Sequence, residues 1–286
     1  MKIRDRQEIT WTFECPIASH LGSLLNREIR DVGQLRLWFR SIGRDPIWGT
    51  LGPQIVQFIY CRSLTVIGMV AMLAVGCSQL SNPASNEENS KNQLIVIGRR
   101  CYERGLFWGT GGDISVRLPG SKQFLIKASM TCLGDMDESK ITTVNPDGLA
   151  LHGPKPSHET LIHARLYGMR PEVGAILHMH SPHATAWASV GKKIPAITQQ
   201  SVTLFRDMGI VPYHPVGSKE LVEAVVACYQ NPNTQVVLME NHGVFVLGED
   251  LYSLLYNAEK VENTAHIAYL ARDLGEPKEF DAKVVY

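Results

Sequence analysis

Ala175-Ile-Leu-His-Met-His-Ser-Pro182 places two histidines at alternate positions of an apolar run. The run from Val173 to His180 predicts a buried strand, and Ser181-Pro182 predicts a turn into a helix. Because alternate side chains of a strand share a face, His178 and His180 should project together, opposite to their apolar neighbours. Two imidazoles placed in this way are typical ligands of zinc or a similar ion, although two polar residues at a strand end need no metal.

The composition is that of a globular protein without excess charge. The 286 residues are 44% hydrophobic and 20% charged, and 28 basic residues balance 28 acidic ones. A net charge of zero gives no reason to expect a nucleic acid or an anionic membrane as a partner. The 6 cysteines are scattered and form no Cys-x-x-Cys pair, so we expect reduced thiols and a cytoplasmic catalytic domain.

Residues 1–90 differ from the rest of the chain. An apolar segment over 63–77 follows a basic residue and ends in Val-Gly-Cys, which resembles a bacterial lipoprotein signal. It lies well inside the chain, however, and is shorter than the roughly 20 apolar residues of a membrane span. A buried helix, a signal or membrane anchor, and sequence upstream of the true start all stay open as interpretations. The polar stretch 78–92 predicts a linker, so we place the domain boundary near residue 90.

Residues 91–276 are predicted to form the catalytic domain, and residues 277–286 a mobile tail. Helical and strand patterns alternate through this domain with turns between them, which indicates an α/β fold. We expect helices over 87–104, 183–190, 218–229 and 250–274, and a further helix that begins at Ser157 as its N-cap. We expect strands over 114–118, 123–128, 141–144, 149–151, 173–180, 209–213, 235–240 and 244–247. The remaining segments are a predicted loop over 129–138 and irregular or extended chain over 194–205.

Two further motifs carry polar groups at turns. Gly109-Thr-Gly-Gly-Asp-Ile-Ser-Val-Arg117 predicts a tight turn that could expose backbone N–H groups to an anion, although a plain turn accounts for it equally well. Asn241-His242-Gly243 lies between two apolar runs, so His242 should sit at a bend between strands. Glu159 falls in the predicted first helical turn after Ser157, where an acidic residue favours the helix dipole.

Four motifs in this order resemble class II aldolases of the fuculose-phosphate aldolase and ribulose-phosphate 4-epimerase type. They are Gly-Thr-Gly-Gly-Asp-Ile-Ser-Val-Arg (109–117), Pro-Ser-His-Glu (156–159), His-Met-His-Ser-Pro (178–182) and Asn-His-Gly (241–243). The resemblance covers about 93–274 and does not extend to residues 1–90. It implies a three-layer α/β/α sandwich around a largely antiparallel sheet, usually assembled as a homotetramer.

The same resemblance implies which residues form the site. His178, His180 and His242 would bind a divalent ion, usually Zn²⁺ with Mn²⁺ as the alternative, and Glu159 would be both a ligand and a base. Tyr213 falls where these aldolases carry a proton donor, although a packed aromatic at a strand end is an equally good account of it. The ion would polarise a carbonyl and stabilise an enediolate, which permits aldol cleavage, epimerisation or decarboxylation.

The predicted substrate pocket departs from that of the sugar-phosphate aldolases. Asp113 replaces an asparagine that binds phosphate, and a carboxylate repels phosphate. Met130 replaces a glycine and His158 a serine, so phosphate recognition is in question. The stretch 127–137 also resembles 3-oxo-tetronate-phosphate decarboxylases. The residues assigned by resemblance to substrate or anion binding are Gly112, Asp113, Lys127, Ser129, Ser157 and His158.

The sequence therefore predicts a divalent-metal-dependent carbon–carbon lyase that acts on a sugar-phosphate or a related hydroxy-keto acid. A decarboxylase of 3-oxo-tetronate 4-phosphate type and a sugar-phosphate 4-epimerase are alternatives within the family. A non-catalytic interaction domain, like the adducin head, is an alternative of another class. The three histidines together with Glu159 disfavour a purely structural role.

Overall fold

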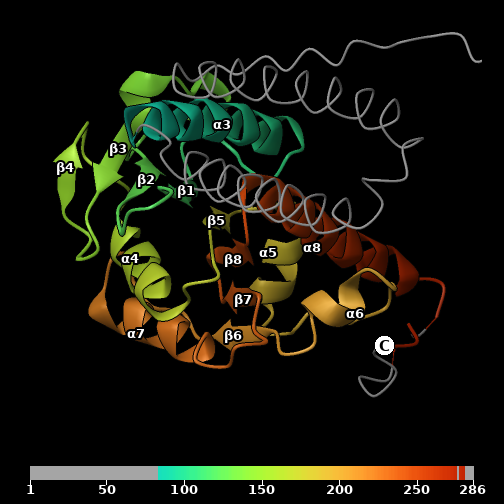
Figure 1. Ribbon diagram of the computed structural model, residues 1–286. Helices are drawn as coiled ribbons and strands as arrows, with labels where there is room; N and C mark the ends of the chain where they lie inside the picture. Colours follow the sequence, from blue (N-terminus) through green and yellow to red (C-terminus); the bar gives the residue numbers. More distant parts are fainter. Residues whose placement is uncertain (1–82, 276, 281–286) are drawn as a thin grey trace, which may run out of the picture. The chain divides into compact units, whose positions relative to one another are not determined.

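The computed structural model describes residues 83–275 and 277–280 of the chain. All interpretations of residues 1–82, including the apolar segment over 63–77, lie outside these residues. Eight strands of the described part form one sheet in the order β4-β3-β2-β1-β5-β8-β7-β6, with helices on both faces (Figure 1). Among these strands only β6 and β7 pair in parallel. The predicted α/β/α sandwich around a largely antiparallel sheet is confirmed.

The described elements follow the predicted alternation of helix and strand. The strands are β1 (Asp113–Arg117), β2 (Phe124–Lys127), β3 (Ile141–Val144), β4 (Ala150–His152), β5 (Ala175–Met179), β6 (Gly209–Val211), β7 (Val236–Met239) and β8 (Gly243–Gly248). The helices are α3 (Pro83–Glu103), α4 (Thr160–Met169), α5 (Pro182–Ser189), α6 (Ser201–Leu204), α7 (Lys219–Cys228) and α8 (Leu251–Ala271), with short 3-10 turns η1 (Leu133–Asp135) and η2 (Glu138–Lys140).

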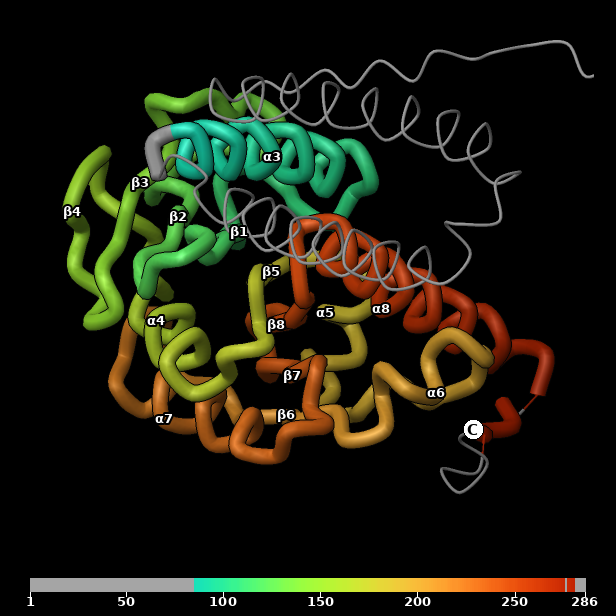
Figure 2. Tube along the Cα trace, in the orientation of Figure 1, coloured from blue at the N-terminus to red at the C-terminus, as the bar shows by residue number. Residues whose placement is uncertain are grey.

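Strand β5 lies near the centre of the sheet between β1 and β8, which run beside it in the chain trace (Figure 2). Its two faces enter different hydrophobic cores. Ala175, Leu177 and Met179 pack into the core under α3, α5 and α8, whereas Ile176 packs into the core under α4 and α7. Each fully buried leucine, isoleucine or methionine side chain among them stabilises the fold by about 1.5–3 kcal/mol. The alternation turns His178 toward the α4 face, as the sequence predicts.

The two C-terminal helices begin where the sequence places their caps. The Ser218 hydroxyl accepts a hydrogen bond from Leu221 N at 3.2 Å at the start of α7. Asp250 and Ser253 form a reciprocal capping box at the start of α8. Each such cap stabilises a helix by about 1 kcal/mol. Helix α8 ends at Ala271, before the predicted end at residue 274.

Several local predictions are wrong. The linker predicted over 78–92 is helical from residue 83, because a proline suits the first helical turn and Lys91 Nζ pairs with Glu87 Oε1 at 2.8 Å. Residues 201–204, expected to be irregular or extended, form α6, and the loop predicted over 129–138 contains η1. Within the predicted tail, Phe280 N donates to Ala196 O at 3.0 Å, and the mobility of residues 277–286 stays a prediction.

No helix in the described part of the chain is long and apolar enough to cross a membrane.

Candidate metal centre

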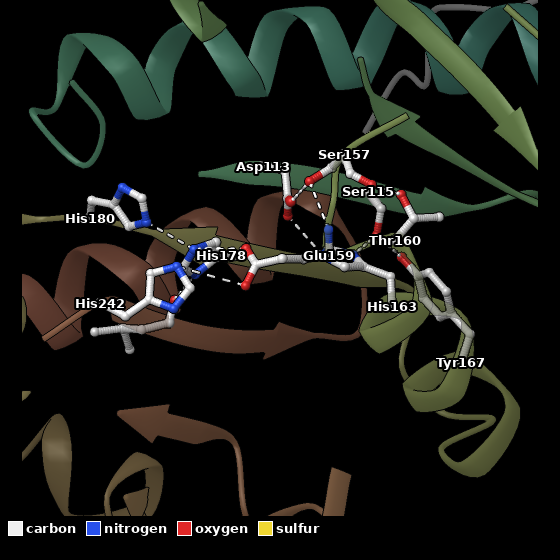
Figure 3. A network of polar contacts seen from close by, with 11 residues as sticks. Asp113, Ser115, Ser157, Glu159, Thr160, His163, Tyr167, His178, His180 and His242 are labelled. Atoms are coloured by element: carbon white, nitrogen blue, oxygen red, sulfur yellow. Dashed lines mark hydrogen bonds and ion pairs between the residues drawn. The ribbon is translucent and has the colours of Figure 1, made fainter. Parts of the chain in front are cut away.

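Three imidazoles from separate parts of the sequence converge at one end of β5 (Figure 3). His178 lies on β5, His180 lies one residue beyond it, and His242 lies in the bend before β8. Their potential ligand nitrogens all lie within 4.8 Å of one another. Nε2 of His178 is 2.9 Å from Nε2 of His180. The predicted meeting of the three histidines is present in the structure.

A tight bend between β7 and β8 brings His242 to the site. Asn241 adopts the left-handed conformation with φ 54°, which asparagine tolerates better than most residues. His242 N donates to Met239 O at 3.1 Å and closes the bend. At Gly243 a Cβ would lie 2.5 Å from Met179 O and 2.6 Å from His180 Cδ2. Glycine is therefore needed for β8 to pass this close to the end of β5.

We expect Gly243→Ala to weaken both the fold and the metal site. Relieving the two overlaps requires His180 or the strand to move, which should cost about 1–3 kcal/mol of unfolding free energy and lower the affinity for Zn²⁺. Gly168→Ala is the control, because a Cβ there meets nothing within 4 Å and Gly168 lies in α4. That change should be neutral or stabilise by about 0.5–1 kcal/mol. Urea unfolding and zinc titration measure both effects, and equal behaviour of the two variants would contradict the prediction.

Glu159 completes the group from the start of α4. Its Oε2 lies 2.9 Å from Nε2 of His178, its Oε1 lies 3.8 Å from Nε2 of His242, and its side chain is 5% exposed. Glu159 is itself the N-cap residue of α4. The prediction that Ser157 caps this helix, with Glu159 in its first turn, is wrong: the Ser157 hydroxyl donates to Oδ2 of Asp113 and accepts from Glu159 N at 3.3 Å, so it caps no N–H within α4.

Burial sets the protonation of these groups in opposite directions. It lowers the pKa of His178, His180 and His242 to about 4 each, so all three imidazoles are neutral at pH 7 and offer lone pairs. Burial, with the nearby Asp113 charge, raises the pKa of the Glu159 carboxyl to about 8, against the opposing effect of His242 and two other nearby histidines. A cation among the imidazoles would favour the ionised carboxylate and oppose this rise.

The residues fit a divalent cation by their donor set and by their unsatisfied atoms. Nδ1 of His178 lies 3.4 Å from the Val244 carbonyl, an arrangement that orients the ring and leaves Nε2 free as a ligand. Oε1 of Glu159 and Nδ1 of His242 are buried and have no hydrogen-bond partner. Zinc–nitrogen bonds of about 2.0–2.1 Å hold ligand nitrogens about 3.3 Å apart, close to the separation of His178 and His180. Three neutral imidazoles and one carboxylate suit Zn²⁺ or Mn²⁺.

The predicted anion-binding residues lie on three segments: the glycine turn into β1, the end of β2 with the loop after it, and the turn before α4. Nζ of the buried Lys127 donates to Thr110 O at 3.2 Å and to Thr131 O at 2.7 Å, so it ties the glycine turn to the loop after β2. Burial lowers its pKa, against the effect of Asp113. Ser129 Oγ lies 3.3 Å from Nδ1 of His158. The predicted roles of all these residues in substrate binding stay predictions.

Three other positions are defined by their backbone or their exposure. Gly112 has φ 69°, and a Cβ there would lie 2.5 Å from His178 O, so the turn requires glycine. Met130 has φ 58° with a side chain that is 75% exposed, which fits its place where aldolases carry glycine. Tyr213 follows β6 and is 57% exposed. Within the described residues no hydrogen bond or ion pair joins it to the histidines, and its role as proton donor stays a prediction.

Sequence reasoning missed a buried histidine next to the site. His163 is 0% exposed, and its Nε2 lies 2.8 Å from Oδ1 of Asp113. Its position four residues after Glu159 was the available signal, because residues i and i+4 share a helix face.

Residues 92–269 match the family model described as Class II Aldolase and Adducin N-terminal domain. The chain belongs to the class II aldolase and adducin family. An L-fuculose phosphate aldolase of Methanococcus maripaludis is 30% identical over 185 residues, which are 65% of this chain and 98% of that protein. A 3-oxo-tetronate 4-phosphate decarboxylase of Escherichia coli K12 is 30% identical over 199 residues, which are 68% of this chain and 92% of that protein.

Solved structures show the same class II aldolase fold. YgbL from Klebsiella pneumoniae superposes with a TM-score of 0.64 at 27% identity and covers 69% of this chain and 96% of its own. An L-fuculose 1-phosphate aldolase superposes with a TM-score of 0.64 at 28% identity, over 68% of this chain and 92% of its own. The family comprises aldolases and decarboxylases, which makes an enzyme, and a lyase, the natural assignment.

Proposed function

We propose that this class II aldolase family member is a divalent-metal-dependent carbon–carbon lyase that acts on a sugar-phosphate or a related hydroxy-keto acid. The observation that carries the proposal is the convergence of three neutral imidazoles and a buried carboxylate at one point. Relatives named as aldolases and as decarboxylases support the substrate class, since each of these names includes a phosphorylated sugar or sugar-acid substrate.

The chain's own residues supply two functions. His178, His180 and His242 would hold Zn²⁺ or Mn²⁺, which supplies Lewis-acid polarisation of a substrate carbonyl when bound. Glu159 lies 2.9 Å from His178 in a buried position, where it can hold or move a proton at Oε2. Its raised pKa lets the carboxyl exist in both protonation states near neutral pH. The side chain is 5% exposed, so solvent has little access to this proton.

A substrate panel tests the proposal. The purified full chain, loaded with Zn²⁺ or with Mn²⁺, is incubated with L-fuculose 1-phosphate, 5-deoxyribulose 1-phosphate and 3-oxo-tetronate 4-phosphate. We expect turnover of at least one of them, with an aldehyde product from an aldolase or carbon dioxide from a decarboxylase. A 4-epimerase would instead convert a sugar phosphate to its epimer. Metal analysis should give about one ion for each site.

The non-catalytic alternative makes the opposite prediction. An adducin-like interaction domain would bind no ion at the histidines and turn over none of the substrates. The unsatisfied buried atoms of Glu159 and His242 favour an ion-binding site over a structural cluster. An absence of both bound metal and turnover would refute the lyase assignment.

Assembly and location are part of the same proposal. We propose a homotetramer in the cytoplasm, on the family resemblance and on the reduced cysteines Cys101, Cys132 and Cys228 of the described residues. Light scattering of the full chain and cell fractionation test the two statements separately.

A further inference from the structure

A buried chain of polar side chains links β1 to α4 on the side of the metal centre that holds Glu159 (Figure 3). Asp113 and Ser115 lie two residues apart on β1 and so face the same side of the sheet. His163 Nδ1 lies 2.7 Å from Ser115 Oγ, which lies 2.8 Å from Tyr167 OH. All four residues are at most 4% exposed.

Asp113 contacts the polypeptide on both sides of Glu159. Its Oδ2 accepts a hydrogen bond from the hydroxyl of Ser157, two residues before Glu159. Its Oδ1 lies 2.8 Å from Nε2 of His163, four residues after Glu159. The ring N–H is not well aligned on this oxygen, so we treat the second contact as electrostatic rather than as a directed hydrogen bond. Ser157 Oγ also accepts from Glu159 N at 3.3 Å.

Asp113, which contacts Ser157 and His163, also lies beside one of the proposed metal ligands. In the β1–β5 ladder Asp113 is the cross-strand partner of His178. Cross-strand partners share a face of the sheet, at a distance of about 5 Å. Asp113 therefore lies beside His178 of β5 and also contacts the turn that carries Glu159.

The ionised carboxylate of Asp113 decides which group donates at the contacts of this buried polar network. An ionised carboxylate only accepts, so Ser157 donates to it and Nε2 of His163 carries a proton. If Nε2 holds the ring's single proton, Nδ1 accepts from Ser115, and Tyr167 then donates to Ser115. Burial by itself would raise the pKa of Asp113, but His163, His178 and Ser157 outweigh it and hold the pKa below its usual value.

We propose that Asp113 and His163 are positioning residues that fix the turn carrying Glu159 against the metal centre. Oδ2 of Asp113 accepts from Ser157, Oδ1 lies 2.8 Å from Nε2 of His163, and the side chain is 1% exposed, so it supports the site rather than contacting substrate. The inference rests on the proposed function, in which Glu159 is the metal ligand and the proton-transfer group.

Metal binding tests the proposal without any turnover. Co²⁺ replaces Zn²⁺ as a visible-absorbing probe, titrated into Asp113→Ala, Glu159→Gln and the double variant. Loss of an outer-shell partner typically costs about 10–100-fold in metal affinity, and we expect that loss in Asp113→Ala together with the spectral change seen in Glu159→Gln. Because Asp113 acts through Glu159, the double variant should bind no more weakly than Glu159→Gln alone. Fold-losses that multiply in the double variant would overturn the proposal.

Conservative and unrelated variants separate positioning from loss of a buried contact. Asp113→Asn keeps an oxygen beside Nε2 of His163 and can pair with Ser157, so it should bind Co²⁺ within about threefold of the native affinity. Thr234→Ala removes another buried hydrogen bond, from Thr234 Oγ1 to Asp207 O at 2.8 Å, and should leave Co²⁺ affinity unchanged. Loss in Thr234→Ala equal to that in Asp113→Ala would overturn the proposal.

Two measurements on metal-free protein keep this inference distinct from the lyase assignment. Imidazole ¹⁵N shifts should show the proton of His163 on Nε2, and amide exchange over 157–163 should rise at least about tenfold in Asp113→Ala and His163→Ala. Failure of the native chain to bind Co²⁺ would refute the proposed function alone. Unchanged exchange over 157–163 in both variants would overturn the positioning role alone.

Discussion

His178→Ala should remove both the bound ion and the activity of this chain. His178 is 1% exposed, its Nε2 lies 2.9 Å from both His180 and Glu159, and its ring packs against His242 at 4.8 Å between centroids. It would therefore be the central ligand of an ion held by this group. Lewis-acid stabilisation supplies several kcal/mol, so we expect kcat/KM to fall by about 10²–10⁴-fold. Metal analysis of the purified variant should show no stoichiometric ion.

A second histidine serves as the matched control for this substitution. His152 is exposed on β4, at the edge of the sheet opposite to β6, and belongs to no metal-ligand group in the described residues. His152→Ala should keep its ion and its turnover. Chelation followed by dialysis should inactivate the native chain, and added Zn²⁺ or Mn²⁺ should restore it. Full activity in the metal-stripped sample would eliminate the mechanism.

Glu159→Gln should leave a folded protein that binds metal more weakly and turns over little substrate. The amide keeps the volume of the carboxylate but cannot accept or release the proton. Positioned acid–base groups contribute about 10²–10⁴-fold to rate, so kcat should fall by that factor. Glu220→Gln, on the exposed face of α7, is the control and should behave as the native chain. A kcat within twofold of native in Glu159→Gln would exclude the proton-transfer role.

The pH dependence of metal-free stability gives an independent test of Glu159. Its pKa rises from 4.5 to about 8 on folding, so the folded protein binds this proton more tightly than the unfolded chain does. The resulting contribution to stability is complete below pH 4.5 and is lost as the pH rises to about 8. Glu159→Gln lacks this contribution, so its urea midpoint should fall less than that of the native chain over this interval. Parallel curves would contradict the raised pKa.

Much of the metal centre was predictable because local pattern and chemistry agree there. The apolar alternation around His178 defines a central strand, and the His-Gly bend at His242 defines a strand end. Side-chain spacing then decides which imidazoles share a face. The caps at Ser218 and Asp250 are equally local signals, and both hold in the structure.

Other features depended on contacts that no local pattern contains. The role of Ser157 is one case: its hydroxyl donates to the carboxylate of Asp113, which lies 44 residues earlier in the chain, and accepts from Glu159 N rather than from an N–H within α4. The role of Lys127 is another, since only the folded loops show that its ammonium group is occupied by two backbone carbonyls.

The sequence by itself determined the family and, through the resemblance of its motifs, the layer order, and it predicted four residues of the candidate metal centre, because motif chemistry is a local property of the chain. Only the tertiary structure decided the pairing of Asp113 with His163 and the orientation of Glu159 toward His178. Both contacts depend on how β1, α4 and β5 pack. Packing brings together side chains whose spacing along the sequence does not predict that they meet.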